Sequence, residues 1–231
     1  MYENYFTNRG VELPNPAECK VTKYLINAIG EDKNKAILDV GCGYGSNLFG
    51  LRNLGFNNIE GIDISDEAIA YCQENGLKVS KCDVTQYNGK KFDFIIMSHV
   101  LEHLPKDKII DTLAFIKNNM LNVGGQLCIM VPNAQSNTNC YWAYEDFTHN
   151  LLFTGGSLLF VLREAGFTNI NFLDVDGTEG MNNALKRIIK KFLLKIYKIN
   201  YMFWNKITGS YWHAPSPIIF TWEIKCLAKN K

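Results

Sequence analysis

Short apolar segments alternate with segments of helical periodicity along most of this chain. Runs rich in Ile, Val and Phe predict strands, and apolar residues spaced three and four positions apart predict helices. Such alternation is typical of an α/β protein with a mostly parallel sheet. We expect strands at 36–40, 59–64, 78–84, 92–98, 126–131, 168–175 and 218–228, and helices at 17–29, 46–54, 66–75, 106–121 and 157–165.

Local signals predict where several helices begin and end. Asp66 is the expected N-cap of the third helix, and Gly76 follows that helix. Gly124 and Gly125 are expected to end the fourth helix, because glycine commonly occupies the position after a helix C-terminus.

Residues 178–217 interrupt the alternation, and we interpret them as an insertion between the last two strands of a single domain spanning 1–231. Within 184–212, Lys and Arg alternate with apolar and aromatic residues. Three interpretations remain open: an amphipathic helix that covers an acceptor cleft, a surface helix on anionic lipid, or an element that binds a phosphorylated acceptor.

Composition excludes several classes of protein. The net charge of +1 over 231 residues argues against nucleic-acid binding, which normally needs a basic face. The seven cysteines are scattered without C-x-x-C spacing, which indicates reduced thiols and neither a disulfide framework nor a zinc site. From the residues that open the sequence we expect no signal peptide, and we expect no membrane span because no apolar run reaches the necessary length. We expect a cytoplasmic protein, with peripheral contact at the inner membrane face through 184–212 as a further hypothesis.

Three glycines directly follow the first predicted strand, at Gly41, Gly43 and Gly45, and a helical segment begins at Ser46. A strand, a glycine turn and a helix N-terminus together form a ligand site from backbone groups. Dinucleotide-binding proteins have the spacing G-x-G-x-x-G, whereas here the third glycine comes one residue early.

Acidic residues close the second and third predicted strands. Asp63 lies 22 positions after Gly41, where a carboxylate accepts hydrogen bonds from a ribose diol. A helix-capping role is the alternative for Asp63, and Asp83 taken alone could be an ordinary turn residue. The fourth strand begins at Phe92-Asp93 and ends at Ser98-His99.

These elements, in this order, resemble the class I S-adenosyl-L-methionine (SAM)-dependent methyltransferases. The resemblance is to the small bacterial kind with Val-Leu-Glu-His-Leu after strand four, found here at 100–104. It implies a Rossmann-like, doubly wound, seven-stranded sheet, mostly parallel with an antiparallel last strand pair. It also implies that SAM is the cofactor and S-adenosyl-L-homocysteine (SAH) the product. The cofactor-binding residues would be Asp39, Gly41, Cys42, Gly43, Gly45, Asp63, Ile64, Asp83, Val84 and Ser98.

Catalytic candidates lie in two later segments. Residues 146–154 resemble the family's D-x-x-H-x-x-x-F-T segment, so His149 beside Asp146 is the candidate general base, with a purely structural histidine as the alternative. His99 is a further catalytic candidate. The H-x-x-E-H pattern at 99–103 also occurs as an inverted zinc-protease motif. Some quinone-precursor methyltransferases place metal ligands here, but we expect packing and no metal. Residues 1–30 are expected to form an N-terminal lid and helix.

The resemblance extends to methyltransferases of bacterial capsule and lipopolysaccharide gene clusters. It therefore implies O-methylation of a surface-polysaccharide precursor, on a sugar or a phosphoramidate substituent. A small-molecule or quinone-type acceptor is the alternative within the same activity. The alternatives of other classes are an NAD-dependent dehydrogenase, disfavoured by the glycine spacing and Asp83, and a non-catalytic subunit that keeps the SAM fold. The expected partner is thus a small-molecule or glycan-precursor acceptor.

Overall fold

One seven-stranded sheet forms the centre of the protein, with the strand order β3-β2-β1-β4-β5-β7-β6. The computed structural model describes residues 4–138, 141–210 and 217–231. Neighbouring strands from β3 through β5 are parallel, whereas β7 is antiparallel to both β5 and β6. The expected doubly wound sheet with an antiparallel end is therefore confirmed. The strands are β1 (Ile37–Val40), β2 (Ile59–Asp63), β3 (Val79–Lys81), β4 (Phe92–Ser98), β5 (Leu121–Pro132), β6 (Thr168–Leu173) and β7 (Glu223–Lys229).

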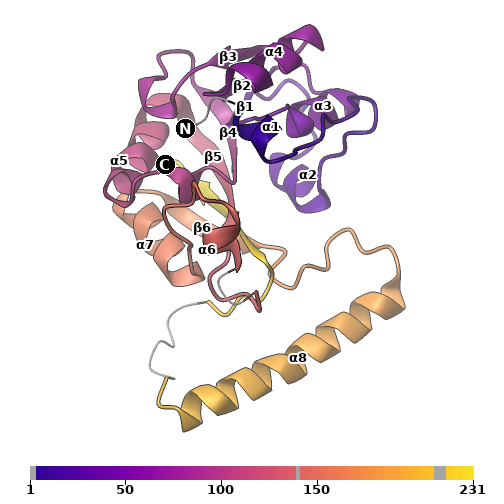
Figure 1. Ribbon diagram of the computed structural model, residues 1–231, viewed down its shortest axis with the longest axis vertical. Helices are drawn as coiled ribbons and strands as arrows, with labels where there is room; N and C mark the ends of the chain where they lie inside the picture. Colours follow the sequence, from indigo (N-terminus) through magenta and orange to yellow (C-terminus); the bar gives the residue numbers. More distant parts are fainter. Residues whose placement is uncertain (1–3, 139–140, 211–216) are drawn as a thin grey trace.

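Helices cover both faces of this sheet (Figure 1). Successive strand residues point to opposite faces, so Ile37 joins one hydrophobic core and Leu38 the other. One layer contains α2 (Lys23–Ile29), α3 (Ser46–Asn53) and α4 (Asp66–Glu74); the other contains α5 (Ile109–Phe115), its π-helical continuation Ile116–Met120, and α7 (Gly155–Glu164). The shorter helices are α1 (Tyr5–Asn8), α6 (Tyr141–Glu145) and the 3-10 turns η1 (Val84–Gln86), η2 (Leu101–His103) and η3 (Lys106–Lys108).

Two of the predicted helix boundaries are wrong. Ser65, not Asp66, is the N-cap of α4: its backbone is extended and its hydroxyl accepts from the Ala68 amide. Asp66 is the first helical residue, and its carboxylate accepts from Lys81 Nζ at 2.6 Å. Gly124 and Gly125 lie inside β5, because the preceding helix already ends at Met120.

Helix α8 (Ala184–Ile207) lies between β6 and β7 in the chain and stands apart from the two helical layers (Figure 1). None of its residues is buried. The rings of Tyr197 and Tyr201 contact Phe220, with centroids 4.8 and 5.2 Å away. Within the described ranges, no helix is both long and apolar enough to cross a membrane. Positions 211 and 212, the end of the predicted 184–212 segment, lie outside the described residues.

Candidate active site

A cavity of about 580 Å³ lies at the carboxyl ends of the parallel strands. Its volume is typical of a small-molecule site. It includes the point between β1 and β4 where the strand order reverses, the usual ligand position in open α/β sheets. Residues at the end of, or directly after, each of the five parallel strands line it: Val40 and Gly41, Ile62 to Ser65, Cys82 to Val84, Ser98 to Val100, and Pro132.

The glycine turn forms one wall of this cavity through Gly41 and Gly43. Both have positive φ, +67° and +50°. A Cβ on Gly41 would overlap the side chain of Val100, so the turn requires glycine on both conformational and steric grounds. Gly45 acts at the end of the turn, where it is the N-cap of α3, and a Cβ there would lie 2.6 Å from Leu77 Cδ1.

Asp63 connects the end of β2 to the glycine turn. Its Oδ2 accepts from the Gly43 amide at 2.8 Å, and its Oδ1 accepts from the Ser65 amide at 2.9 Å. Burial raises the pKa of this carboxyl, although the backbone donors oppose that shift. Asp83 follows the neighbouring strand β3, and its Oδ1 accepts from the amide and hydroxyl of Thr85. Both acidic residues line the cavity.

Seven of the ten predicted cofactor-binding residues line the cavity: Gly41, Gly43, Asp63, Ile64, Asp83, Val84 and Ser98. The other three, Asp39, Cys42 and Gly45, do not. Asp39 is only 1% exposed, and burial raises its pKa to about 7 against a smaller opposite effect of Asn47. Asp39 is therefore buried beneath the glycine turn and is not accessible to a ligand in the cavity.

His99 is held between two carboxylates at the end of β4. Its Nδ1 lies 3.2 Å from Glu102 Oε1 and its Nε2 lies 3.2 Å from Glu223 Oε2, while the ring stacks on Trp222. Burial alone would lower the pKa of His99, but the two carboxylates raise it to about 9. Both ring nitrogens must donate, so His99 is an imidazolium at neutral pH and has no lone pair for a proton. This geometry argues against His99 acting as a general base.

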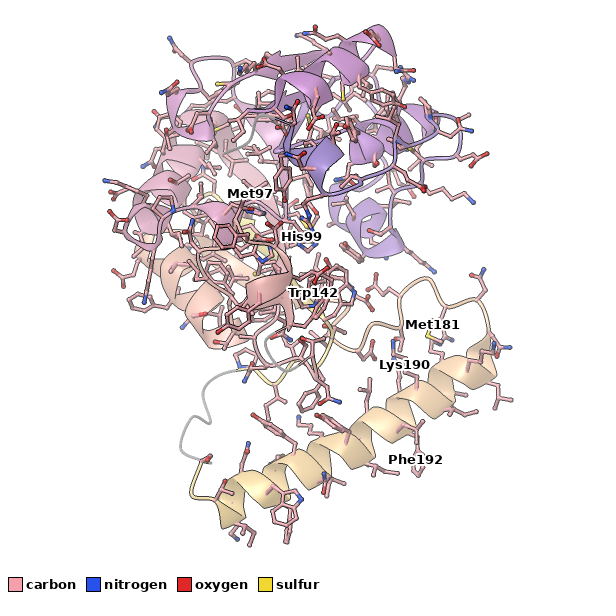
Figure 2. The ribbon with its side chains drawn as sticks, in the orientation of Figure 1. Met97, His99, Trp142, Met181, Lys190 and Phe192 are labelled. Carbon is pink, nitrogen blue, oxygen red and sulfur yellow. The ribbon has the colours of Figure 1, made fainter. Side chains whose placement is uncertain are left out.

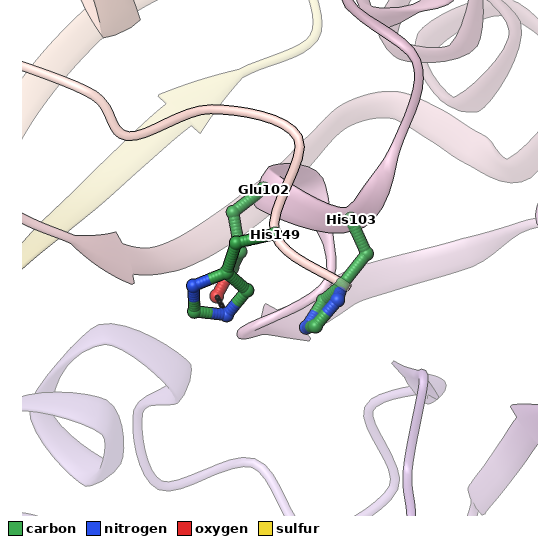
Figure 3. A group of neighbouring side chains, drawn as sticks. All are labelled: Glu102, His103 and His149. Atoms are coloured by element: carbon green, nitrogen blue, oxygen red, sulfur yellow. Dashed lines mark ion pairs between the residues drawn. The ribbon is translucent and has the colours of Figure 1, made fainter. Parts of the chain in front are cut away.

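His149 differs from His99 in that, among the described residues, only one of its ring nitrogens makes a hydrogen bond (Figure 3). Its Nδ1–H donates to the Trp142 carbonyl at 2.5 Å, which leaves the lone pair on Nε2. That Nε2 lies 3.7 Å from Asp146 Oδ2 and 3.9 Å from Glu102 Oε1. His149 lines the cavity. Its Nε2 is therefore the ring nitrogen that can accept a proton.

The ring of His103 packs against His149, with centroids 4.7 Å apart. Its Nδ1 bonds Thr148 Oγ1 at 2.9 Å, and burial lowers its pKa. One ligand atom each of Glu102, His103 and His149 lies within 4.8 Å of the others (Figure 3). Glu102 is fully buried, and its Oε2 has no hydrogen-bond partner among the described residues. A carboxylate and two imidazoles form a donor set that can hold a divalent transition metal.

Asp146 binds two residues of the N-terminal segment that line the cavity. Its Oδ2 accepts from Tyr5 Oη at 2.6 Å and from the Arg9 guanidinium, and its Oδ1 accepts from Thr148. Although burial opposes it, these donors lower the pKa of Asp146 to about 2, so the carboxylate is ionised at neutral pH. Tyr5, Phe6 and Arg9 all line the cavity. The predicted lid role of residues 1–30 fits these contacts of α1, although positions 1–3 lie outside the described residues.

Two tryptophans that line the cavity and one glutamate behind it were not foreseen from the sequence. Trp142 and Trp222 line the cavity, their ring centroids 5.5 Å apart, and Glu223 binds His99 from the start of β7. Figure 2 labels Trp142 and His99 at this site. Glu223 and Trp222 lie more than 120 positions after His99, so no local pattern indicates that they reach it.

Comparisons with known proteins agree with this geometry. Residues 17–171 match the family model described as a methyltransferase domain. A protein of Haemophilus influenzae, described as uncharacterized, is 30% identical over 133 residues; the match covers 51% of this chain and 53% of that protein. The chain thus matches about half the length of this curated relative.

Solved structures show the same fold. A SAM-dependent methyltransferase from Archaeoglobus fulgidus is 22% identical, with a TM-score of 0.59 over 85% of this chain and 86% of its own. The magnesium protoporphyrin IX methyltransferase of Synechocystis, solved with bound SAH, is 14% identical, with a TM-score of 0.56 over 90% of this chain and 79% of its own. The family match covers most of the chain, and the glycine turn and acidic strand ends lie where such a fold binds its ligand. The chain therefore belongs to the class I SAM-dependent methyltransferases, and SAM is its cofactor.

Proposed function

We propose that this protein O-methylates a hydroxyl group of a surface-polysaccharide precursor, with His149 as the general base. When bound, SAM supplies an electrophilic methyl group on a sulfonium. The position of His149 Nε2 carries the proposal: it lines the cavity as a proton acceptor between the carboxylates of Asp146 and Glu102. It would accept the proton that the acceptor hydroxyl loses as the new carbon–oxygen bond forms.

A base is useful only for an acceptor that must lose a proton. A sugar hydroxyl is such an acceptor, whereas an oxygen of a phosphate or phosphoramidate group is already ionised. The arrangement around His149 therefore favours the sugar. The indole rings of Trp142 and Trp222 support this choice, because sugar rings present C–H groups that pack against aromatic faces.

The remaining side chains would position and protect the reactants. Tyr5, Phe6 and Arg9 lie over the cavity and would exclude water once the acceptor is bound. Holding the acceptor oxygen and the methyl group at about 3 Å in such a space supplies much of the rate enhancement.

Two substitutions at position 149 test the proposal. His149→Ala should lower turnover by about 10²–10⁴-fold and leave SAH affinity nearly unchanged. His149→Asn is the matched variant, because its side-chain amide can still donate to the Trp142 carbonyl but cannot take up the proton. Turnover is measured as SAH release with a panel of nucleotide-linked sugars, and the product is identified by mass spectrometry. Recovery of turnover in His149→Asn would show that this histidine is structural and would overturn the proposal.

A quinone-type acceptor with a bound divalent metal is the second candidate. The convergence of Glu102, His103 and His149 favours it, since the buried Glu102 Oε2 is an unsatisfied acceptor that a cation would satisfy. In that case Glu102, His103 and His149 would hold the metal, which would supply Lewis-acid activation of the acceptor oxygen. Methylation of a hydroquinone that is abolished by EDTA and by His103→Ala would select this candidate over the glycan.

A further inference from the structure

Helix α8 carries an unusual share of the charge of this protein. Seven of the chain's 24 basic residues lie between Ala184 and Ile207, and none of its 23 acidic residues does. The helix therefore has a charge of +7, and the rest of the chain has a net charge of −6. An overall charge of +1 conceals a strongly basic element on an otherwise acidic protein.

One side of α8 is an exposed apolar face. The residues that form it lie three and four positions apart, so they share one side of the helix. Their side chains are between 49% and 66% exposed, which is unusual for large apolar residues in such a continuous row. The outer apolar face consists of Leu185, Ile188, Phe192, Ile196, Ile199, Phe203 and Ile207.

The opposite side of α8 faces the rest of the protein. Lys190 Nζ donates to the Gly177 carbonyl at 2.6 Å, and Tyr197 and Tyr201 pack on Phe220. In Figure 2, Lys190 points toward the rest of the chain and Phe192 points away from it. These contacts fix how the helix is rotated, so the outer apolar face is directed to the exterior.

We propose that α8 docks this methyltransferase on an anionic bilayer surface, with the outer apolar face inserted at the headgroup boundary. An amphipathic helix with basic flanks and a bulky apolar face has the features of an interfacial helix. By helical spacing, Lys195 and Lys206 each follow a residue of the outer apolar face by three positions and border that face. Lys198 follows Lys195 by three positions along the same side of the helix, so these three side chains can reach lipid phosphates. At an anionic surface each such residue adds about 1 kcal/mol of attraction.

The charge of α8 and its apolar face together distinguish an anionic bilayer from a second copy of this chain and from a nucleic acid as the binding partner. A second copy of α8 would cover the apolar residues, but it would bring two helices of +7 together. A nucleic acid would satisfy the charge but leave the apolar face in water. An anionic bilayer satisfies the charge and the apolar face together.

Docking would place the cavity next to the membrane. Phe220, against which α8 packs, is two residues before Trp222 in the cavity wall. No described residue of α8 lines the cavity itself. The proposal is therefore independent of which acceptor the enzyme uses, and changes on the outer face should leave SAH binding intact.

Vesicle sedimentation tests the proposal directly. We expect binding to vesicles of phosphatidylcholine and phosphatidylglycerol (3:1), little binding to pure phosphatidylcholine, and weaker binding as salt screens the charges. Lys195→Glu, Lys198→Glu and Lys206→Glu together should lower the partition coefficient about 100-fold or more. Lys20→Glu, Lys23→Glu and Lys231→Glu together change the net charge equally at exposed positions elsewhere and should have a much smaller effect.

The apolar contribution is tested in the same assay. Phe192→Ser with Phe203→Ser should lower binding at least tenfold, whereas Phe160→Ser with Val123→Ser, also at exposed positions, should not. An SAH thermal shift confirms that each variant is folded. The proposal is wrong if the protein does not bind anionic vesicles, or if both sets of substitutions in α8 leave vesicle binding unaltered. Dimers in analytical ultracentrifugation that dissociate on Phe192→Ser would instead assign the face to a second copy. Binding of a DNA duplex in place of the vesicles would likewise overturn it.

Discussion

Replacing Asp63 by alanine should weaken the binding of SAH and loosen the glycine turn at once. In the structure this carboxylate accepts from the amides of Gly43 and Ser65 at 2.8 and 2.9 Å. Loss of a charge-assisted hydrogen bond to the ribose should cost about 1–3 kcal/mol, which is roughly 5- to 150-fold in Kd. The free energy of unfolding should fall by about 1–3 kcal/mol. This is less than the loss of two charge-assisted hydrogen bonds would give, because burial disfavours the ionised form of Asp63 and raises its pKa.

Calorimetric titration with SAH measures the affinity, and thermal unfolding without ligand measures the stability. Asp66→Ala is the matched control, since this acid is three positions away, is exposed and does not line the cavity. Because bound ribose favours the ionised form of Asp63, SAH affinity of the wild type should also rise with pH through the acidic range, and Asp63→Ala should remove that dependence. A folded Asp63→Ala protein with unchanged SAH affinity would refute the ribose assignment.

Three further changes probe the cavity wall. Gly41→Ala should cost about 2–5 kcal/mol in stability, from the positive φ and the overlap with Val100; chemical denaturation measures it, and a cost below about 1 kcal/mol would contradict the turn geometry. The raised pKa of His99 means that its ion pairs stabilise fully below about pH 6.5 and are lost as pH rises through about 9. Allowing for solvent screening, this is about 1–3 kcal/mol, and Glu223→Gln should flatten the decline of melting temperature over that range. Tyr5→Phe removes a donor to Asp146 and should accelerate SAH release in stopped-flow experiments; an unchanged rate would exclude the lid role of Tyr5.

The sequence alone predicts the half of the site that is built from local elements. The glycine turn and Asp63 are recognisable because strand, turn and helix follow one another within a short stretch of chain. The succession of strands and helices along the chain follows from the same alternation, whereas the doubly wound arrangement of the sheet was implied by the family resemblance. These features depend on neighbours in sequence, and periodicity reports on neighbours.

The acceptor half depends on contacts between distant segments. Tyr5 reaches Asp146 across 141 positions, and His99 meets Glu223 across 124. No local pattern distinguishes a glutamate at the start of a strand from an ordinary surface acid. The sequence likewise suggested His99, Asp146 and His149 together as catalytic, but only the orientation of the two imidazoles separates a paired imidazolium from a proton acceptor.

Binding of SAM in the cavity is best tested by a thermal-shift titration with SAH, with NAD in parallel. Saturation at about 100 times Kd should add about 2.7 kcal/mol of stability, which is several degrees for a chain of this size. We expect this shift with SAH, a smaller one in Asp63→Ala, and none with NAD. A shift with NAD and none with SAH would contradict the assignment of the cavity to SAM.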